Sequence, residues 1–247
     1  MYLTIQGLVL RVTDYNDRDA LLTVLTRRHG KLTVKARGLR RKNSPLTAPC
    51  QLLAFGEFTL FEYRGMYTIN EASAIELFQN LRRDLGKLSL GTYFAQVAEV
   101  ISQEDLPNPE LLSLLLNCLY ALSKLDLPEA QVKAVFELRA ACLAGYTPEL
   151  TGCHLCGNEC PERFDISAGR LECSAHRSPD SGGIRMPVSA GALEAMRYIV
   201  LCDAKRLFAF QTGPESLEQL SQAAESYLAT QLERGFPTLD FYKSLLI

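Results

Sequence analysis

The fold of this chain is indicated first by two neighbouring segments, Ala20-Leu-Leu-Thr-Val-Leu-Thr26 and Lys31-Leu-Thr-Val-Lys-Ala-Arg37. Both are rich in apolar and β-branched residues, and polar residues alternate with them in the second segment, as in half-buried strands. The dipeptide His29-Gly30 between them predicts a tight turn. The two segments therefore predict a β-hairpin within an N-terminal β-domain.

Three further segments extend this β-domain in both directions. Residues 2–13 alternate around buried-type aliphatic residues, 51–63 form a long strand pattern with a break at Gly56, and 66–74 follow the turn Arg64-Gly65. Five short strands with glycine at the bends are typical of a small barrel. We expect an OB-fold over residues 1–80, and an SH3-like barrel fits the same pattern.

From residue 81 onward the apolar residues recur at helical spacing. Helices are predicted over 81–101, from Asn108-Pro109 onward, and from Pro128 to Gly145, where proline and glycine mark the ends. The helical pattern resumes at 189–201 and 214–233. The predicted fold class is therefore α+β and multidomain, with a helical domain over 81–149 and 179–247 that is interrupted by an insertion at 150–178.

The first 80 residues contain the most unusual charge pattern of the chain. They hold eleven Lys and Arg against seven Asp and Glu, whereas the remaining residues hold fifteen against twenty-one. Between positions 27 and 42 there are eight basic residues and no acidic one. A solvated charged face is the alternative interpretation, but the missing acidic residues favour a surface that binds a polyanion. The basic residues are Arg27, Arg28, Lys31, Lys35, Arg37, Arg40, Arg41 and Lys42.

The insertion contains a cysteine and histidine cluster with the spacing of a zinc site. It reads C-x2-C at Cys153 and Cys156, then sixteen residues, then C-x2-H at Cys173 and His176. Such turns point two ligands each at one tetrahedral centre, and the segments 163–166 and 169–172 between them predict a supporting hairpin. A closed four-ligand site predicts one structural zinc ion per chain. Cys160 remains an alternative to His176 as the fourth ligand, and His154 is a weaker one.

The sequence lacks the motifs of common enzymes. There is no phosphate-binding G-x-x-x-x-G-K-[ST] loop, no G-x-G-x-x-G, no G-x-S-x-G and no acidic cluster suited to two-metal chemistry. We therefore expect a binding protein and not an enzyme; a zinc hydrolase or nuclease is the alternative. No apolar run approaches the roughly 20 residues of a membrane span, and the start has no export signal. A cytoplasmic protein without membrane contact is predicted.

Several motifs together resemble those of the RecO family of bacterial recombination mediators. They are the strand Gly7-Leu-Val-Leu10, the segments that begin at Asp19 and at Gly30-Lys-Leu, and the Cys153-x-x-Cys156-Gly turn. The basic stretch Ala36-Arg-Gly-Leu-Arg-Arg-Lys-Asn-Ser44 and the terminal Phe241-Tyr-Lys-Ser-Leu also fit. The likeness covers almost the whole chain. One departure is that zinc-bearing members usually close the site with a second C-x-x-C, where this chain has His176.

The resemblance implies an OB-fold, a helical domain and an inserted zinc module. It implies binding of single- and double-stranded DNA and ATP-independent annealing at the nucleoid. It further implies work beside RecR and RecF to load RecA onto strands coated by SSB. An adaptor that docks acidic partner tails, such as that of SSB, on the basic run is the alternative function.

On this reading the basic residues contact phosphates. Lys35, Arg37, Arg40, Arg41 and Lys42 form the main path, which Arg27, Arg28 and Lys31 extend. Phosphate contacts carry no sequence information, so binding is expected to be nonspecific. Neutralising about five phosphates predicts a log–log salt slope of roughly −3.5 on single strands. Phe55, Phe58, Phe61 and Tyr63 are candidates either for base stacking or for the barrel core.

Overall fold

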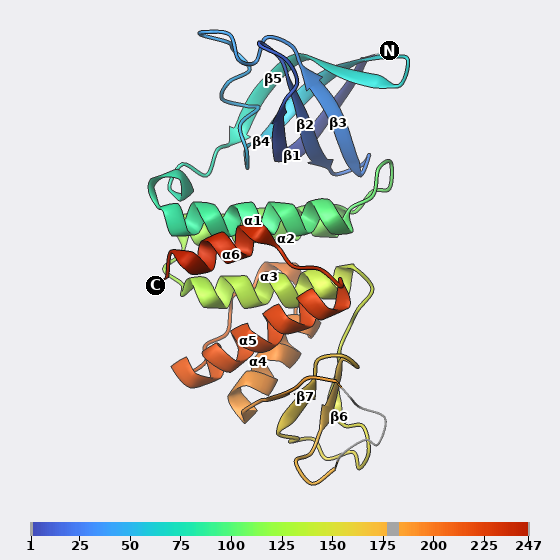
Figure 1. The fold of residues 1–247 in the computed structure, drawn as a ribbon, viewed down its shortest axis with the longest axis vertical. Helices are drawn as coiled ribbons and strands as arrows, with labels where there is room; N and C mark the ends of the chain where they lie inside the picture. Colours follow the sequence, from blue (N-terminus) through green and yellow to red (C-terminus); the bar gives the residue numbers. More distant parts are fainter. Residues whose placement is uncertain (1, 177–182, 247) are drawn as a thin grey trace. The chain divides into compact units, whose positions relative to one another are not determined.

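A computed structural model describes residues 2–176 and 183–246 of the chain (Figure 1). It divides into two compact units, one of Met1–Leu125 with Phe236–Ile247 and the other of Asp126–Gly235. The helices are therefore shared between the units, and the C-terminal residues return to the first. The expected junction between the zinc module and the second helical segment, at residues 178 and 179, lies outside the described residues.

The N-terminal strands close into a barrel in the order β1-β2-β3-β5-β4. β1 pairs with β4 in antiparallel orientation and β3 with β5 in parallel orientation, which completes the ring. A closed five-stranded barrel with this crossover has the topology of an OB-fold, so the first of the two predicted barrel types is confirmed. The strands are β1 (Tyr2–Asp14), β2 (Ala20–Thr26), β3 (Lys31–Ala36), β4 (Phe55–Tyr63) and β5 (Met66–Glu76).

Two details of the fourth strand differ from the sequence prediction. The strand begins at Phe55 and not at residue 51, because Leu53 has a left-handed backbone (φ 61°) and its N–H donates to the Val9 carbonyl. Gly56 does not break the strand. A Cβ at this position would lie 2.6 Å from the Ser73 carbonyl oxygen, so the glycine allows β4 and β5 to approach closely.

The interior of the barrel is filled by the inward side chains of all five strands, which alternate with outward polar residues. Phe58 and Leu60 of β4 are fully buried there beside residues of the neighbouring strands. The core also includes Cys50 from the β3–β4 connection, and burial raises the pKa of its thiol to about 12. The buried core residues are Ile5, Val9, Leu22, Val24, Leu32, Val34, Ala36, Leu46, Cys50, Phe58, Leu60 and Ile69.

Three helices complete the first unit. Asn108 accepts a backbone N–H and caps α2 at its predicted start, whereas α1 begins at Leu85 and not at residue 81, because Asp84 is extended and accepts the Lys87 N–H as its cap. The barrel is held against α1 by an ion pair of 2.9 Å between Arg11 and Glu99. A short helix at the C-terminus, which was not predicted, packs on α1. The elements are the 3₁₀ turn η1 (Leu81–Arg83), α1 (Leu85–Ile101), α2 (Pro109–Lys124) and α6 (Pro237–Ser244).

The second unit combines three helices with a small sheet of order β6-β8-β7-β9. The predicted hairpin is confirmed as β7 and β8, whereas β6 and β9 were not predicted because strands this short lack a clear period. No helix among the described residues is long and apolar enough to span a membrane. The elements are α3 (Glu129–Leu143), β6 (Glu149–Cys153), β7 (Arg163–Asp165), β8 (Arg170–Glu172), β9 (Arg185–Pro187), α4 (Ala190–Leu201), the 3₁₀ turn η2 (Ala204–Arg206) and α5 (Pro214–Gln231).

Candidate nucleic-acid interface and metal centre

The eight basic residues of the run lie toward the two ends of strand β3. Arg27, Arg28 and Lys31 lie at the β2–β3 turn, which we call the turn end. Lys35, Arg37, Arg40, Arg41 and Lys42 lie at the close of β3 and in the loop after it, which we call the loop end. A six-residue strand is about 20 Å long, so the structure does not gather all eight into one patch.

At the turn end, Arg27 and Arg28 are exposed and line a cavity of about 290 Å³ beside Gln6 and Glu57. Lys31 is directed elsewhere, because its Nζ donates to the Glu99 carbonyl of α1 at 2.8 Å. His29 closes the turn through its backbone N–H, which donates to Thr26 Oγ1. This end therefore offers two exposed guanidinium groups for a polyanion.

At the loop end, two aspartates from outside the basic run pair with its cations. They come from the end of β1 and from the β1–β2 loop. Lys35 Nζ lies 3.2 Å from Asp19, and Arg40 Nη1 lies 3.0 Å from Asp14. Asp19 also accepts the Gly38 N–H at 2.8 Å. This hydrogen bond holds the pKa of Asp19 below its ordinary value against the opposing effect of burial, and Asn16 and Lys35 add to the lowering. The basic run is thus partly balanced in three dimensions.

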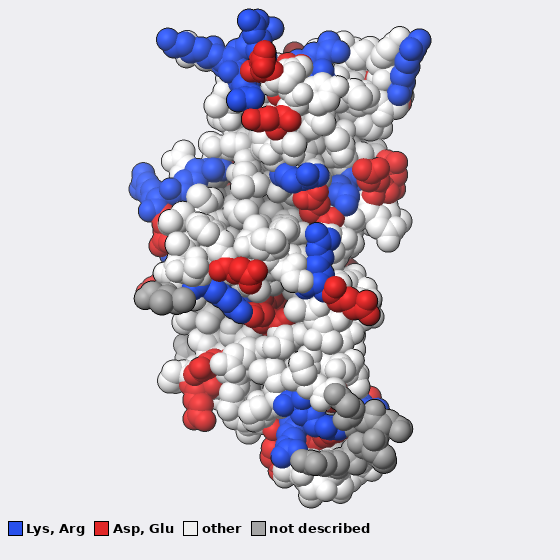
Figure 2. All heavy atoms as spheres, in the orientation of Figure 1, with Lys and Arg blue, Asp and Glu red and all other residues white. Residues whose placement is uncertain are grey.

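The remaining loop-end cations are exposed, and the fold adds another to them. Arg37, Arg41 and Lys42 project into solvent, and the Arg40 N–H donates to the Arg18 carbonyl, which brings exposed Arg18 beside them. Figure 2 shows Lys and Arg side chains gathered at the barrel loops with acidic residues among them. The sequence did not single out Arg18, because it lies in a turn with three aspartates that was interpreted as an acidic segment.

The aromatic candidates for base stacking divide by burial. Phe58 is fully buried in the barrel core and Phe55 is half-buried. Phe61 and Tyr63, which alternate with the core residues on β4, are exposed. The strand period directs Phe58 inward, and of the three on the outer side only Phe61 and Tyr63 are exposed.

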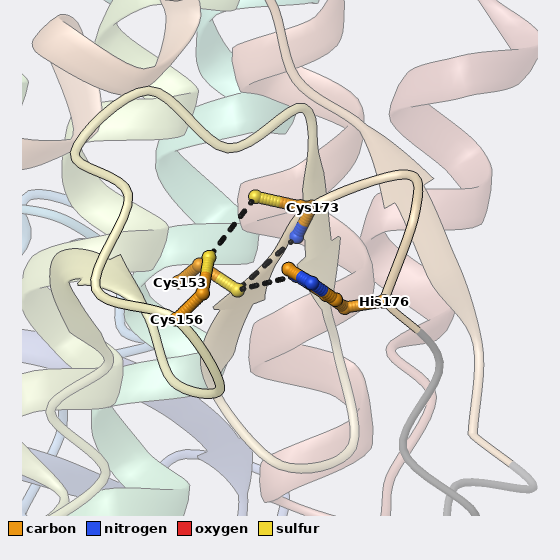
Figure 3. Close-up of side chains that lie close together, drawn as sticks. All are labelled: Cys153, Cys156, Cys173 and His176. Atoms are coloured by element: carbon orange, nitrogen blue, oxygen red, sulfur yellow. Dashed lines mark hydrogen bonds between the residues drawn. The ribbon is translucent and has the colours of Figure 1, made fainter.

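The cysteine and histidine cluster converges in the second unit (Figure 3). Among the described residues, the ligand atoms of Cys153, Cys156, Cys173 and His176 all lie within 4.8 Å of one another. The sulfurs of Cys156 and Cys173 are 3.8 Å apart, and Cys153 Sγ lies 3.9 Å from His176 Nδ1. Zinc–sulfur bonds of about 2.3 Å in a tetrahedron place sulfurs about 3.8 Å apart, so the group can hold a metal ion and fits zinc.

The two other candidate ligands lie outside this group. Cys160 is exposed, and its backbone N–H donates to the Asn158 side chain. His154 Nδ1 lies 3.1 Å from the Leu171 carbonyl oxygen, and its Nε2 lies 3.9 Å from Glu172. Among the described residues, His176 and not Cys160 or His154 lies with the three cysteines.

The surroundings of the cluster favour a thiolate at Cys153. Burial raises the pKa of this thiol, but backbone N–H groups of Leu155, Cys173 and Cys156 outweigh it and lower the pKa to about 6. At Cys173, the Asn158 amide lowers the pKa of the thiol, but burial and the neighbouring cysteines raise it. The net result is a pKa above the ordinary value. Donors aimed at sulfur are the usual environment of a bound metal thiolate.

Arg197 of α4 holds this metal module to the helices of the same unit. Its guanidinium donates to the carbonyls of Leu150, Thr151 and Glu159 at 2.7 to 3.1 Å, and pairs with Glu194. These carbonyls belong to β6 and to the loop after the first pair of cysteines. One side chain therefore anchors both sides of the first metal-binding turn.

A cavity of about 920 Å³ in the second unit bears on the enzyme alternative. It is lined by α4, the segment between α4 and α5, and the start of α5, and no described lining residue is a histidine. Burial raises the pKa of its Cys202 thiol, and its Ser216 hydroxyl lies 2.9 Å from the Ser189 hydroxyl and not beside a base. The described lining thus contains no activated nucleophile.

An OB-like barrel followed by helices and a possible metal module defines a class of multidomain proteins, and comparisons identify the family within it. The N-terminal model of Recombination protein O matches residues 1–78, and its C-terminal model matches 82–240. The chain therefore belongs to the RecO family. Members of this family are named as DNA repair or recombination proteins.

Individual relatives align with this chain over nearly their full lengths. The DNA repair protein RecO of Acetivibrio thermocellus is 34% identical over 247 residues, which is 99% of this chain and 97% of the relative. RecO of Alkaliphilus metalliredigens is 29% identical over 99% of this chain and its own entire length. RecO of Symbiobacterium thermophilum is 28% identical over 98% of this chain and 96% of the relative.

Proposed function

We propose that this chain is a DNA-binding recombination mediator without enzymatic turnover. It anneals complementary single strands and, with RecR and RecF, helps to load RecA onto SSB-coated single-stranded DNA during recombinational repair at the nucleoid. Membership of the RecO family supports the repair role. The observation that carries the DNA-binding part is the exposed cationic loop end of an OB-like barrel.

In this proposal the loop end contacts phosphates of either single- or double-stranded DNA. Arg37, Arg41 and Lys42 are exposed, while Lys35 and Arg40 exchange their aspartate partners for phosphate. Arg27 and Arg28 at the turn end extend the path, and Lys31 joins it by exchanging the Glu99 carbonyl for phosphate. Annealing follows because a cationic surface screens two polyanions and raises their encounter rate, which requires no nucleotide hydrolysis.

The metal centre has a structural role in the proposal. Cys153, Cys156, Cys173 and His176 hold one zinc ion, whose chemistry is to cross-link the two turns of a module that is too small to have a large core. The functional modules in this proposal are those predicted from the sequence: residues 1–80, the helical segments 81–149 and 179–247, and the insertion 150–178. In this proposal the first module binds DNA.

The test is the annealing rate of two SSB-coated complementary oligonucleotides, with and without this protein, in the absence of ATP. Acceleration that fades steeply with added salt is expected, since the contacts are to phosphates. The triple variant Arg37→Glu, Arg40→Glu and Arg41→Glu should lose both DNA binding and annealing. Retained annealing in this variant would remove the loop end from the mechanism.

The same experiment separates the proposal from the adaptor alternative. An adaptor docks the acidic tail of a partner such as SSB on the basic run and has no annealing activity of its own. Capture of SSB without any acceleration of annealing would therefore favour the adaptor. Loss of SSB binding but not of naked-DNA binding in the triple variant would also favour an acidic tail as the ligand of this loop.

A further inference from the structure

Several large aromatic side chains are exposed on the outer face of the barrel. Tyr2 is 63% exposed, Phe61 40% and Tyr63 61%, although neighbouring residues of the same strands are fully buried. The rings of Tyr2 and Phe61 lie against each other with centroids 5.4 Å apart. Burial of such rings is normally favourable, so a cluster of them on an open sheet face indicates a binding surface.

The strand register connects this cluster to the cationic loop end. Tyr2 is opposite Phe61, Phe61 is opposite Thr68, and Thr68 is opposite Lys35, across the four strands β1, β4, β5 and β3. Residues in register point to the same side of a sheet, so these four share the outer face. Adjacent strands are about 4.8 Å apart, so the row covers about 14 Å.

The charges beside the row suit an anionic ligand. None of the four residues in the row is acidic, and Lys35 at one end leads directly to Arg37. At the tip of the β4–β5 hairpin, the Arg64 guanidinium lies over the Tyr63 ring, 5.3 Å from its centroid. Aromatic side chains with a cation on either side, Lys35 and Arg64, suit a single strand, whose bases stack on rings while its phosphates contact cations.

We propose that Tyr2, Phe61 and Tyr63 form a base-stacking platform for single-stranded nucleic acid, with Arg64 and Lys35 as its flanking phosphate contacts. The inference rests on the proposed function, because it names the single-strand site of the same barrel. A paired duplex has its bases stacked inside and cannot use this surface. The platform therefore provides the preference for unpaired strands, whereas the loop end contacts any phosphate backbone.

The test exploits the absence of tryptophan from the chain. The variant Phe61→Trp carries a single tryptophan, whose fluorescence is quenched when a base stacks on the indole. We expect quenching by a single-stranded oligonucleotide, and little quenching by an abasic oligonucleotide with the same number of phosphates. Tyr63→Trp provides the same readout at a more exposed position if the first variant folds poorly. The matched control is Tyr120→Trp on α2, a position 52% exposed, which should not respond.

Affinity gives an independent measurement. The double variant Phe61→Ala with Tyr63→Ala should weaken single-strand binding by at least about fivefold and leave duplex binding unchanged. Retained single-strand affinity together with an unquenched tryptophan would overturn the platform but leave the proposed function standing. Failure of the parent chain to bind any DNA would overturn both. A tryptophan signal that follows protein concentration and not DNA would overturn the platform and assign the face to self-association.

Discussion

Folding separates the residues of the basic run, whereas it brings the residues of the cysteine and histidine cluster together. The eight basic residues are close in the sequence, but β3 separates them into a turn end and a loop end about 20 Å apart. The four ligand residues spread over two turns and a hairpin, yet their ligand atoms lie within 4.8 Å. Proximity in sequence is thus a poor guide to proximity in space, because a strand separates near neighbours and a hairpin brings distant residues together.

The two regions also differ in how their charges are balanced. The loop end has Asp14 and Asp19 as partners from another loop, so part of its positive charge is neutralised before any ligand arrives. In the metal cluster the backbone N–H groups and Asn158 are directed at sulfur, which prepares anionic ligands for a cation. The first region is a surface that exchanges partners, and the second is a closed site.

The largest expected effect breaks the closed site. Cys173→Ser removes one of four ligands, so the metal content should fall from about one ion per chain to about zero, and the sheet around β6 and β8 should lose its protection from hydrogen exchange. Elemental analysis of the purified chain is the measurement. Cys160→Ser is the matched control and should keep its metal. Loss of metal in the control together with retention in His176→Ala would exchange the fourth ligand.

The next effect tests whether the two ends of the basic run act as one path. Neutralising Arg37, Arg40 and Arg41 with glutamine removes three of about five phosphate contacts without adding repulsion, so the salt slope on single strands should fall from about −3.5 to about −1.4. Arg27→Glu with Arg28→Glu should weaken binding of an oligonucleotide of about 16 nucleotides and spare one of about 4. Equal losses for both lengths would show that the ends are not separate.

A smaller effect concerns the attachment of the metal module. Arg197→Ala removes three charged hydrogen bonds to carbonyls and should destabilise the anchoring of β6 by about 2 to 3 kcal/mol, with metal content unchanged. Hydrogen exchange at residues 149–153 measures this loss. Arg197→Lys keeps the charge but not the fork, and should recover only part of the protection. A full recovery would reduce the role of Arg197 to charge alone.

The smallest effect concerns the acidic partners of the loop end. Asp19→Asn removes the charge opposite Lys35 in a partly buried ion pair and should tighten DNA binding by about two- to threefold. Asn16→Ala is a control that alters the same loop without changing its charge. Unchanged or weaker binding in Asp19→Asn would show that the loop geometry matters more than the released lysine.

Acidification provides the same test without substitution. The folded pKa of Asp19 lies below its ordinary value of 3.8, so its contribution to stability is complete above that value and lost as the pH falls through the lower folded pKa. The protection factor of the Gly38 amide, which donates to this carboxylate, should therefore fall only below about pH 4. A protection factor that already falls near neutral pH would contradict this account.

The sequence alone predicted the elements with a clear period or a strong local signal. Alternation of apolar residues identified the barrel strands, proline and capping residues identified the helix starts, and ligand spacing identified the metal-binding group. These features depend on near neighbours in the chain, so they can be recognised without knowledge of the tertiary structure. The short strands β6 and β9 and the terminal helix α6 were missed because a few residues carry too little periodicity.

Tertiary structure alone decided which groups face each other. It placed Asp14, Arg18 and Asp19 against the basic loop, left Cys160 and His154 outside the cluster of Cys153, Cys156, Cys173 and His176, and aligned Tyr2 with Phe61. It also sorted equivalent aromatics, with Phe58 inside and Phe61 outside. The physical reason is that strand pairing and loop packing join residues far apart in the chain, and local sequence preferences do not specify those partners.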